Sequence, residues 1–386
     1  MTHGGGDGRP QRSLRTASLG ISTTAICGVR DHGALLAEAL AHERCPCSTH
    51  WLDRKGASLR AARRQVDAWT QRLPAELAAV RADAALLHYS VFSYAFRGLP
   101  LFVHPLLAAV RRAQLPLVTI LHEFVYPWRR DGVRGTAWAI SQRALLIDVM
   151  RASDSVVTTT DFQAEWLRSR PWLARRPVAI APVFSNLPAP ARARQGDRDS
   201  SVSTVGVFGY AYGPPTVSLV VQALRLLADR GVDARVELLG APGRSSAAAQ
   251  LWLSAARDAG LRHAPSFSGT LEAQQLSDAL AACDALLFVD PLGPNSRKTT
   301  LAASLSSGRP VIAVDGPRRW RELADAHAAK IVEPQADALA GALAQLLDDR
   351  AAREALAARG RTFAEQSMSA ARAAHTIAGL LRDVAS

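Results

Sequence analysis

Short apolar runs rich in β-branched residues alternate along the chain with longer stretches rich in alanine and leucine. This alternation predicts strands joined by helices, as in a doubly wound parallel sheet. The predicted strands are residues 16–22, 48–52, 84–90, 117–123, 155–160 and 178–183 in the first half, and 203–209, 235–241, 265–269, 285–290, 310–315 and 330–334 in the second half. The stretches between them are predicted to be helices, as is the chain from residue 336 almost to its end.

A polar segment interrupts the alternation near the middle of the chain. Residues 186–202 are rich in proline, arginine and aspartate and contain almost nothing to bury, which is typical of a linker. Since 386 residues exceed what one core usually organises, we predict two Rossmann-like lobes, residues 16–185 and residues 203–386, the second including the C-terminal helices. The polar, glycine-rich residues 1–15 are predicted to be a disordered tail rather than a signal peptide.

Composition excludes several classes of protein. No apolar run reaches the roughly 18 residues that a membrane-spanning helix needs. The four cysteines have no zinc-finger spacing, so we expect no metal site and a reducing, cytoplasmic environment. The net charge of +12 comes from arginines spread over nearly every predicted helix without interleaved aromatic residues, so we do not expect nucleic acid as a partner.

The predicted helix 57–73 is amphipathic. Its apolar stripe consists of Leu59, Ala62, Val66, Trp69 and Leu73, whereas Arg60, Arg63, Arg64 and Arg72 lie away from that stripe. The helix either packs on its sheet in the ordinary way or, in addition, rests its basic face on an anionic membrane. The second possibility predicts peripheral membrane contact through the N-terminal lobe.

Ligands of doubly wound sheets bind at the carboxyl ends of the strands, so the loops that begin at residues 23, 122, 209 and 291 are expected to meet in one cleft. Neither the first of these loops nor the GYAYG loop (209–213) carries G-x-G-x-x-G, which argues against a nicotinamide enzyme. Gly28, before a helix expected near Gly33, either lets the backbone approach a ligand or only forms a turn. His122, at a strand end, is either structural or faces the ligand.

The most informative stretch is DPLGPNSRKTT (290–300), where a strand gives way to a helix. Ser296, Arg297, Lys298, Thr299 and Thr300 gather at the helix N-terminus, where free N–H groups and the helix dipole attract anions. Ser296 or Thr299 could instead be a simple N-cap beside a solvated basic pair. Because cations are unfavourable at a helix N-terminus unless an anion binds there, the stretch predicts a phosphate site.

Several motifs together resemble a known family. The second half contains GRPVI (308–312), preceded by VGVFGYAYGPPTVSLVVQAL (205–224), VELLGAPG (236–243) and FSGTLEAQQLSDALAACDALLFVDP (267–291). The first half contains CGVRDHGALLAEAL (27–40), HYSVFSYAFRGLPL (88–101), TILHEF (119–124) and PVFSNLP (182–188). In this order and spacing the motifs resemble the retaining, nucleotide-sugar-dependent glycosyltransferases of the GT-B fold, family four.

The resemblance implies that two lobes face each other across a cleft, with the nucleotide diphosphosugar donor on the second lobe and the acceptor on the first. The acceptor would be a glycan, a lipid-linked molecule or a small natural product, and neither a metal nor a cofactor would take part. His122 matches the family's histidine near the donor sugar, Gly28 the first-loop glycine near the diphosphate, and Gly269, Thr270 and Leu271 the loop around the nucleobase.

Two departures from the family affect the predicted donor site. Asn295 and Ala303 stand where two glutamates are usual, and the stretch from Tyr210 to Pro215 stands where an arginine and a lysine are usual. The phosphate contacts have therefore moved to Arg297 and Lys298, with Tyr210 and Asn295 still lining the donor, or catalysis has been lost. The alternatives to a transferase are a catalytically silent subunit that partners an active one, and a nucleotide-sugar epimerase of the same fold.

Overall fold

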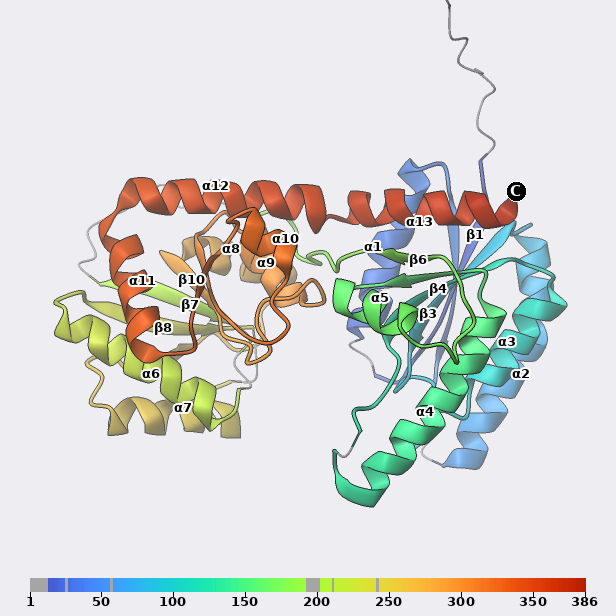
Figure 1. The fold of residues 1–386 in the computed structure, drawn as a ribbon, viewed down its shortest axis with the longest axis horizontal. Coiled ribbons are helices and arrows are strands. Elements are labelled where there is room, and N and C mark those ends of the chain that lie inside the picture. Colours follow the sequence, from blue (N-terminus) through green and yellow to red (C-terminus); the bar gives the residue numbers. More distant parts are fainter. Residues whose placement is uncertain are drawn as a thin grey trace, which may run out of the picture. The chain divides into compact units, whose positions relative to one another are not determined.

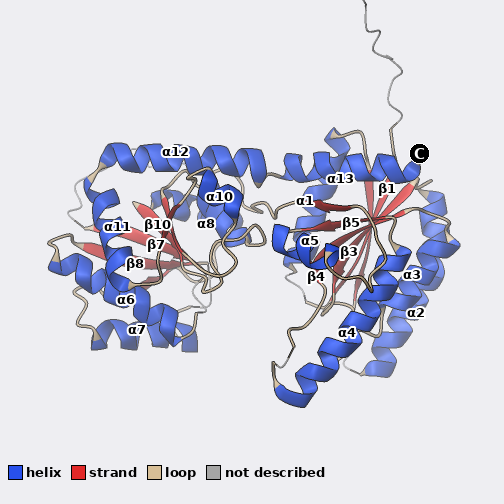
Figure 2. Ribbon diagram, viewed as in Figure 1, coloured by secondary structure: helices blue, strands red, loops and turns tan. Residues whose placement is uncertain are grey.

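The computed structural model describes residues 13–24, 27–55, 58–128, 130–191, 202–209, 212–240 and 243–386. The chain divides into two compact units, of which the first is Met1–Ala181 with Ala373–Ser386 and the second is Pro182–Arg372. Each unit contains one six-stranded sheet in which every pair of neighbouring strands is parallel, with helices on both faces (Figures 1 and 2).

The first unit has the strand order β2-β1-β3-β4-β5-β6. Its strands are β1 (Thr16–Ser22), β2 (Cys47–Asp53), β3 (Ala84–Ser90), β4 (Leu117–Glu123), β5 (Ser155–Thr158) and β6 (Val178–Ile180). Its helices are α1 (Gly28–His42), α2 (Leu59–Ala79), α3 (Val103–Arg112), α4 (Gly132–Ala152), α5 (Asp161–Arg168) and most of α13 (Ala370–Ala385).

Alternation along the strands gives this sheet two different faces. On one face, Leu19, Leu87 and Tyr89 are buried in a core to which α2, α3, α4 and α5 contribute. On the opposite face, α1 packs against β1, β2 and β3 and buries Leu36 and Leu40. That second face also carries buried polar side chains.

The second unit has the strand order β12-β11-β10-β7-β8-β9. Its strands are β7 (Ser203–Phe208), β8 (Ala234–Leu239), β9 (Ser266–Phe267), β10 (Ala285–Phe288), β11 (Val311–Val314) and β12 (Lys330–Val332). Its helices are α6 (Pro214–Asp229), α7 (Ala247–Asp258), α8 (Ala273–Ala282), α9 (Thr299–Ser306), α10 (Arg321–Asp325), α11 (Ala336–Asp348) and α12 (Arg350–Ser367).

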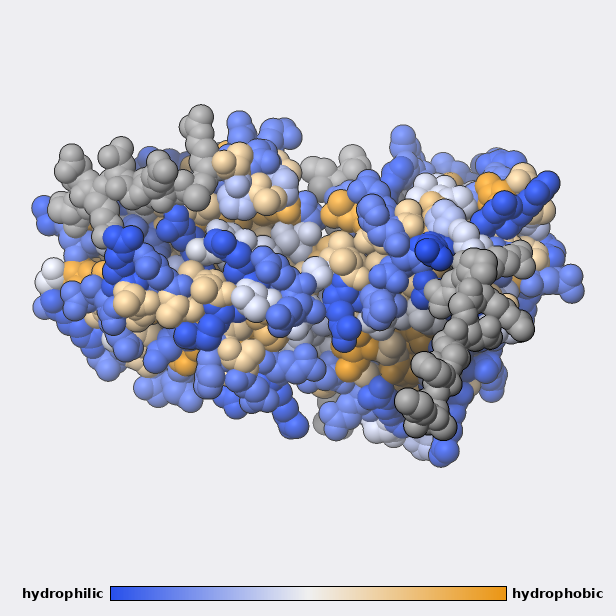
Figure 3. All heavy atoms as spheres, turned by 90° about the horizontal axis from the view of Figure 1, so that it is seen from above, coloured by the Kyte–Doolittle hydropathy of each residue, from blue (hydrophilic) through white to orange (hydrophobic). Residues whose placement is uncertain are grey.

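Two apolar clusters cover the two faces of the second sheet. One joins alternate strand residues such as Val205 and Leu287 to α6, α7 and α11, with Trp252 fully buried among them. The other joins Leu286 and Phe288 to α8, α9 and α12. The surface in Figure 3 is mostly hydrophilic, with apolar side chains exposed in smaller groups.

The twelve predicted strands are all present in the predicted order, and the α/β class is confirmed. The second unit begins at Pro182 and ends at Arg372, whereas the predicted second lobe was residues 203–386. Residues 373–386 belong to the first unit rather than the second, where Arg382 donates to the carbonyl of Glu43. The described part of the predicted linker packs on α8, because Ser277 Oγ donates to the carbonyl of Pro188 at 2.7 Å.

Residues 13–15, predicted to lie in the disordered tail, are attached to the first unit. The Leu14 N–H donates to the Arg44 carbonyl at 3.0 Å, and the Arg15 N–H donates to Asp83 Oδ2 at 2.8 Å. The rest of the predicted tail lies outside the described residues.

The amphipathic helix predicted at 57–73 is α2, which extends to Ala79. Ala62, Val66, Trp69 and Leu73 are buried as predicted, but Leu59 is 41% exposed because it is the first helical residue and lies at the edge of the core. The four arginines Arg60, Arg63, Arg64 and Arg72 are exposed. The structure thus supports ordinary packing of α2, and membrane contact through its basic face stays a prediction.

Candidate functional site

The strand order of the second sheet reverses between β7 and β10. The chain runs from β7 outward to β8 and β9 and then returns to β10 on the other side of β7. Ligands of doubly wound sheets bind at such a switch point, beyond the carboxyl ends of the strands. The loops after β7 and β10 therefore form the candidate site of this unit. Tyr210, which was predicted to line it, lies outside the described residues.

A carboxylate and an ammonium group meet in the loop after β10. Asp290 Oδ2 lies 2.5 Å from Lys298 Nζ, and the two side chains are 12% and 32% exposed. Asp290 Oδ1 accepts a hydrogen bond from the Leu292 N–H at 2.9 Å, which holds the carboxylate at the end of the strand. Burial, followed by the negative charge of Asp290, raises the pKa of Tyr212 to about 12. The loop after β7 therefore adjoins this ion pair.

Helix α9 begins beside the ion pair without a side-chain cap. Its N-cap residue is Lys298, whose side chain makes no capping hydrogen bond, so neither Ser296 nor Thr299 is the N-cap. The first N–H groups of a helix have no partner within the helix, and here no side chain of a described residue replaces one. Thr299 is exposed, and Thr300 lies next to Gly209, where an added Cβ would be 3.7 Å from Thr300 Cγ2. Uncapped N–H groups and Lys298 thus share one loop at the switch point.

Asn295 and Ser296 are buried and maintain the shape of the loop. Asn295 Nδ2 donates to the Gly293 carbonyl at 3.1 Å, and Asn295 Oδ1 accepts from the Arg297 N–H at 3.2 Å. Ser296 is 1% exposed, and its carbonyl accepts a hydrogen bond from the Val183 N–H at 2.8 Å. These contacts favour a structural role for both residues over direct contact with a ligand. Arg297 is half-buried.

The predicted nucleobase loop follows β9. Gly269 has a φ of +69°, which favours glycine, Thr270 is exposed and Leu271 is half-buried against the core. Ser268 Oγ accepts from the Gly240 N–H at 3.1 Å and donates to the Gly269 carbonyl at 3.0 Å, which joins the loops after β8 and β9. Both loops lie at the carboxyl edge of the same sheet, on the β8 side of the switch point.

In the first unit His122 belongs to a cluster of three histidines. Its ring stacks on His88 with centroids 5.5 Å apart, and His32 of α1 meets it edge-on at 5.4 Å. His88 Nδ1 lies 3.3 Å from His122 Nε2, within hydrogen-bond distance. The Gln163 amide donates to the His122 carbonyl at 3.3 Å. The sequence pointed to His122 as a single residue, but in the structure it contacts residues of α1, β3 and α5.

Strand alternation places His122 on the same face as His88, and the pairing of β3 with β4 shifts register beside it. Tyr89 pairs with Leu121, but Ser90 pairs with Glu123, so His122 has no direct partner on β3. Such bulges re-aim a side chain and occur often beside active sites. The strand order reverses at β1 in this sheet too, with β2 on one side and β3 on the other, and the cluster lies on the α1 face of these strands.

Burial keeps two of the histidines uncharged. It lowers the pKa of His32 to about 4, and burial followed by the charge of His32 lowers the pKa of His88 to about 3. His88 Nε2 is buried without a hydrogen-bond partner among the described residues. Since an orphan N–H is rarer than an orphan acceptor, we expect His88 to carry its proton on Nδ1 and to donate to His122 Nε2.

The cluster depends on a glycine in α1. An added Cβ at Gly33 would lie 2.9 Å from the Trp51 ring and 3.3 Å from His88 Cε1. The predicted helix start near Gly33 is wrong, because α1 begins at Gly28 and Gly33 is needed for packing instead. Around Gly28 an added Cβ would meet nothing within 4 Å, so no contact in this unit requires a glycine there.

Sequence reasoning missed Asp290, Tyr212, His32 and His88 as parts of these sites. A signal existed for Asp290, which ends an apolar strand and precedes Pro291 and Gly293. The histidines gave no signal, since residues 32, 88 and 122 are far apart in the sequence and are brought together by the fold.

In the part of the chain that the structure describes, no group of three or more His, Cys, Asp or Glu side chains is arranged to hold a metal ion. None of the described helices combines the length and the apolar character that crossing a membrane requires. The cytoplasmic location and the cofactor-free reaction stay predictions.

Comparisons with known proteins identify the fold. Residues 202–349, which span β7 to α11, match the family described as "Glycosyl transferases group 1". Solved structures similar to the whole chain include a glycosyltransferase from Rickettsia africae, with a TM-score of 0.69, 12% identity and coverage of 96% of this chain and 98% of that one. The fold is that of the GT-B glycosyltransferases.

Two other GT-B structures match over a similar extent. HepE from Anabaena, in complex with UDP and glucose, has a TM-score of 0.67 and 14% identity, covering 95% of this chain and 99% of its own. Sucrose-phosphate synthase from Thermosynechococcus elongatus has a TM-score of 0.63 and 14% identity, covering 96% and 99%. A comparison with curated protein sequences gave no match. The predicted GT-B fold is thereby confirmed, while the facing of its lobes across a cleft stays a prediction.

Proposed function

We propose that this GT-B protein transfers a sugar from a nucleotide diphosphosugar to an acceptor, with retention at the anomeric carbon and without a metal ion. The observation that carries the proposal is the uncapped N-terminus of α9, with Arg297 and Lys298 beside it, at the switch point of the sheet. This site lies within the segment that matches the group 1 glycosyl transferases.

The chemistry of donor cleavage fits these groups. When the bond between the anomeric carbon and the diphosphate breaks, negative charge develops on the departing phosphate oxygen. The Lys298 ammonium, the Arg297 guanidinium and the N–H groups at the start of α9 would stabilise that charge. Lys298 has three N–H donors, so it can bind a phosphate oxygen while it still contacts Asp290.

His122 in the first unit is proposed to support transfer near the donor sugar. It lies at the end of β4 and is 8% exposed; its ring contacts His88, and its backbone carbonyl accepts a hydrogen bond from Gln163. The first unit would also bind the acceptor, which we propose to be a glycan, a lipid-linked molecule or a small natural product.

A donor panel tests the proposal. HepE was solved with UDP and glucose, so UDP-glucose is the first donor to incubate with the protein, followed by other UDP-, GDP- and ADP-sugars. We expect one donor to raise the melting temperature and to release its nucleoside diphosphate slowly in the absence of an acceptor.

Two other outcomes would contradict transfer. A donor that binds without any release, even when candidate acceptors are present, would indicate a catalytically silent subunit. Epimerisation of a nucleotide sugar without an acceptor would indicate an epimerase, an activity named for a putative UDP-N-acetylglucosamine 2-epimerase from Listeria monocytogenes of the same fold (TM-score 0.62, 13% identity).

A further inference from the structure

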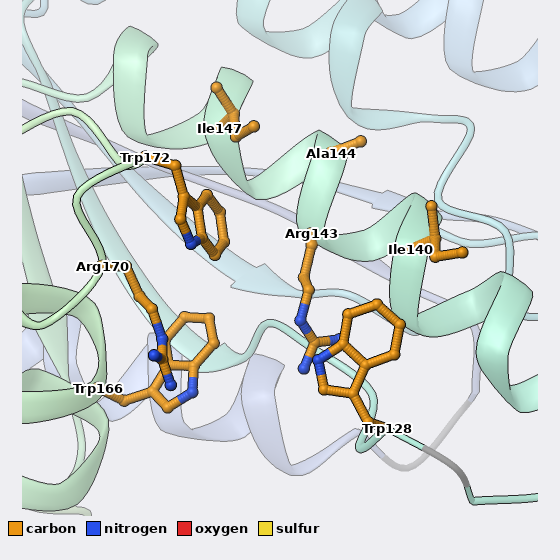
Figure 4. Close-up of a pocket in the computed structure, with 8 residues that line it drawn as sticks. All are labelled: Trp128, Ile140, Arg143, Ala144, Ile147, Trp166, Arg170 and Trp172. Carbon is orange, nitrogen blue, oxygen red and sulfur yellow. The ribbon is translucent and has the colours of Figure 1, made fainter.

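A pocket lies in the first unit between α4 and the end of α5. Its volume is about 540 Å³, which is within the range of small-molecule sites. Figure 4 shows Trp166, Arg170 and Trp172 on one side of the pocket, and Trp128 and Arg143 on the other. Ile140, Ala144 and Ile147 of α4 complete the lining.

The walls of this tryptophan pocket are apolar and partly open to solvent. Trp128 is 52% exposed, Ile140 56% and Trp172 41%, which is unusual for side chains of this size. Each indole contacts a neighbour: Trp166 meets Trp172 edge-on with ring centroids 6.0 Å apart, and the Arg143 guanidinium lies 4.2 Å from the centre of the Trp128 ring. The pocket therefore presents fixed aromatic surfaces to a ligand.

All polar side-chain groups that line the pocket are hydrogen-bond donors. Indole N–H groups and guanidinium groups cannot accept hydrogen bonds, and no carboxylate, amide or hydroxyl side chain is among the lining residues. Neither Arg143 nor Arg170 forms an ion pair with any residue that the structure describes. Burial, followed by the charge of Arg170, lowers the pKa of Arg143, so the two guanidinium groups repel each other weakly across the pocket.

Charge complementarity therefore defines the ligand. We propose that the tryptophan pocket binds a small amphiphilic anion, in which an apolar ring system lies among the indoles and a single carboxylate or phosphate group accepts hydrogen bonds from Arg143 and Arg170. Both carboxylate and phosphate groups can pair with a guanidinium group through two parallel hydrogen bonds.

Calorimetric titration of the full chain with matched probes tests the proposal. The probes are 2-naphthoate, the neutral 2-naphthalenemethanol, which has the same ring system, and acetate, which has only the anionic group. We expect 2-naphthoate to bind at least about tenfold more tightly than the alcohol, and acetate to bind too weakly to detect. Equal affinity for the two ring compounds, or no binding of either, would overturn the proposal.

Arg170→Gln is the decisive variant. It should reduce 2-naphthoate affinity about tenfold while leaving the alcohol unaffected. Arg143→Gln should act in the same direction, but Arg143 also donates to the carbonyls of Tyr126 and Ala139, so its loss also affects the loop. Arg151→Gln, on the exposed end of α4, is the matched control and should change nothing.

A membrane is the alternative occupant of these exposed tryptophans. Vesicles of phosphatidylglycerol that bind the protein but are not displaced by 2-naphthoate, together with no binding of 2-naphthoate in solution, would assign the surface to a lipid bilayer. That result would overturn the small-anion site.

Discussion

At the scale of single residues, Lys298 forms an ion pair with Asp290 of the same chain. The sequence placed two cations at a helix N-terminus and predicted an anion to balance them. The structure supplies one in Asp290, at 2.5 Å from Lys298 Nζ. The Lys298 side chain is 32% exposed and its ammonium has further N–H donors, so a diphosphate can still bind it in competition with Asp290. Because Asp290 already balances the charge of Lys298, that charge alone no longer requires a bound phosphate. The uncapped N–H groups at the start of α9 still favour one.

Removing the competing carboxylate should strengthen donor binding. In Asp290→Asn, Lys298 is released and a negative charge next to the diphosphate is lost, so we expect nucleoside diphosphates to bind several-fold more tightly. Calorimetry with UDP or the best nucleotide of the donor panel measures this, and the bare nucleoside serves as the control. Weaker binding of the diphosphate would show that Asp290 positions Lys298 instead of competing for it.

The orientation of His122 should matter for the rate of transfer. His122→Ala is expected to lower kcat by about 10–100-fold, the cost of one charged hydrogen bond in the transition state. His88→Phe keeps the buried ring but removes the contact at 3.3 Å, and we expect it to lower kcat with little change in donor KM or melting temperature. If kcat is unchanged in both variants, the histidine pair has only a structural role.

At the scale of elements, the order of strands was predictable and the ends of elements were not. The strand runs were visible because buried parallel strands are nearly continuous in apolar residues. The start of α1 was misplaced because Gly28 and Gly33 both suggest a helix boundary, and packing against Trp51 and His88 decides the role of Gly33. In the loop from Asp290 to Thr300, the residue types suggested phosphate, but only the fold distinguishes exposed Thr299 from buried Ser296.

The N-terminus of α1 provides a test at this scale. Gly28→Ala meets no neighbour in this unit, so stability in urea should stay the same or rise by up to about 1 kcal/mol from the better helix former. If a donor diphosphate approaches the helix as the family resemblance implies, donor KM should rise at least severalfold. Unchanged KM would indicate that Gly28 is only the first residue of a helix.

At the scale of the whole molecule, the division into units was only partly predictable. The polar linker predicted two lobes, and the structure contains two sheets of six strands each. The C-terminal residues 373–386 were assigned to the wrong unit, since an amphipathic pattern shows that a face of a helix is buried but not which sheet covers it. Ile377 and Leu381 of α13 are buried, as the pattern requires.

Acid should destabilise the first unit selectively. His32 and His88 have pKa values near 4 and 3 in the folded protein, below the ordinary value of 6.5, so the unfolded chain takes up protons first as the pH falls. Stability is thus complete above about pH 6.5 and declines below it, by up to about 1.4 kcal/mol per pH unit for each histidine.

Denaturation at pH 7 and pH 5 measures this dependence. Trp51 and Gly33 lie against His88, and His122 lies against both rings. The variant His88→Phe should lose part of the pH dependence. A wild-type stability that is equal at the two pH values would contradict the assignment of neutral, buried histidines.

The central claim is that the start of α9 binds the diphosphate of a nucleotide-sugar donor. Its most direct test is calorimetry of a nucleoside diphosphate and the corresponding nucleoside with the wild-type protein, Arg297→Ala and Lys298→Ala. The control is Arg257→Ala, an exposed arginine in the last turn of α7 in the same unit. We predict that each site variant weakens diphosphate binding by about 10–100-fold and nucleoside binding far less. Wild-type affinity for the diphosphate in both site variants would contradict the claim.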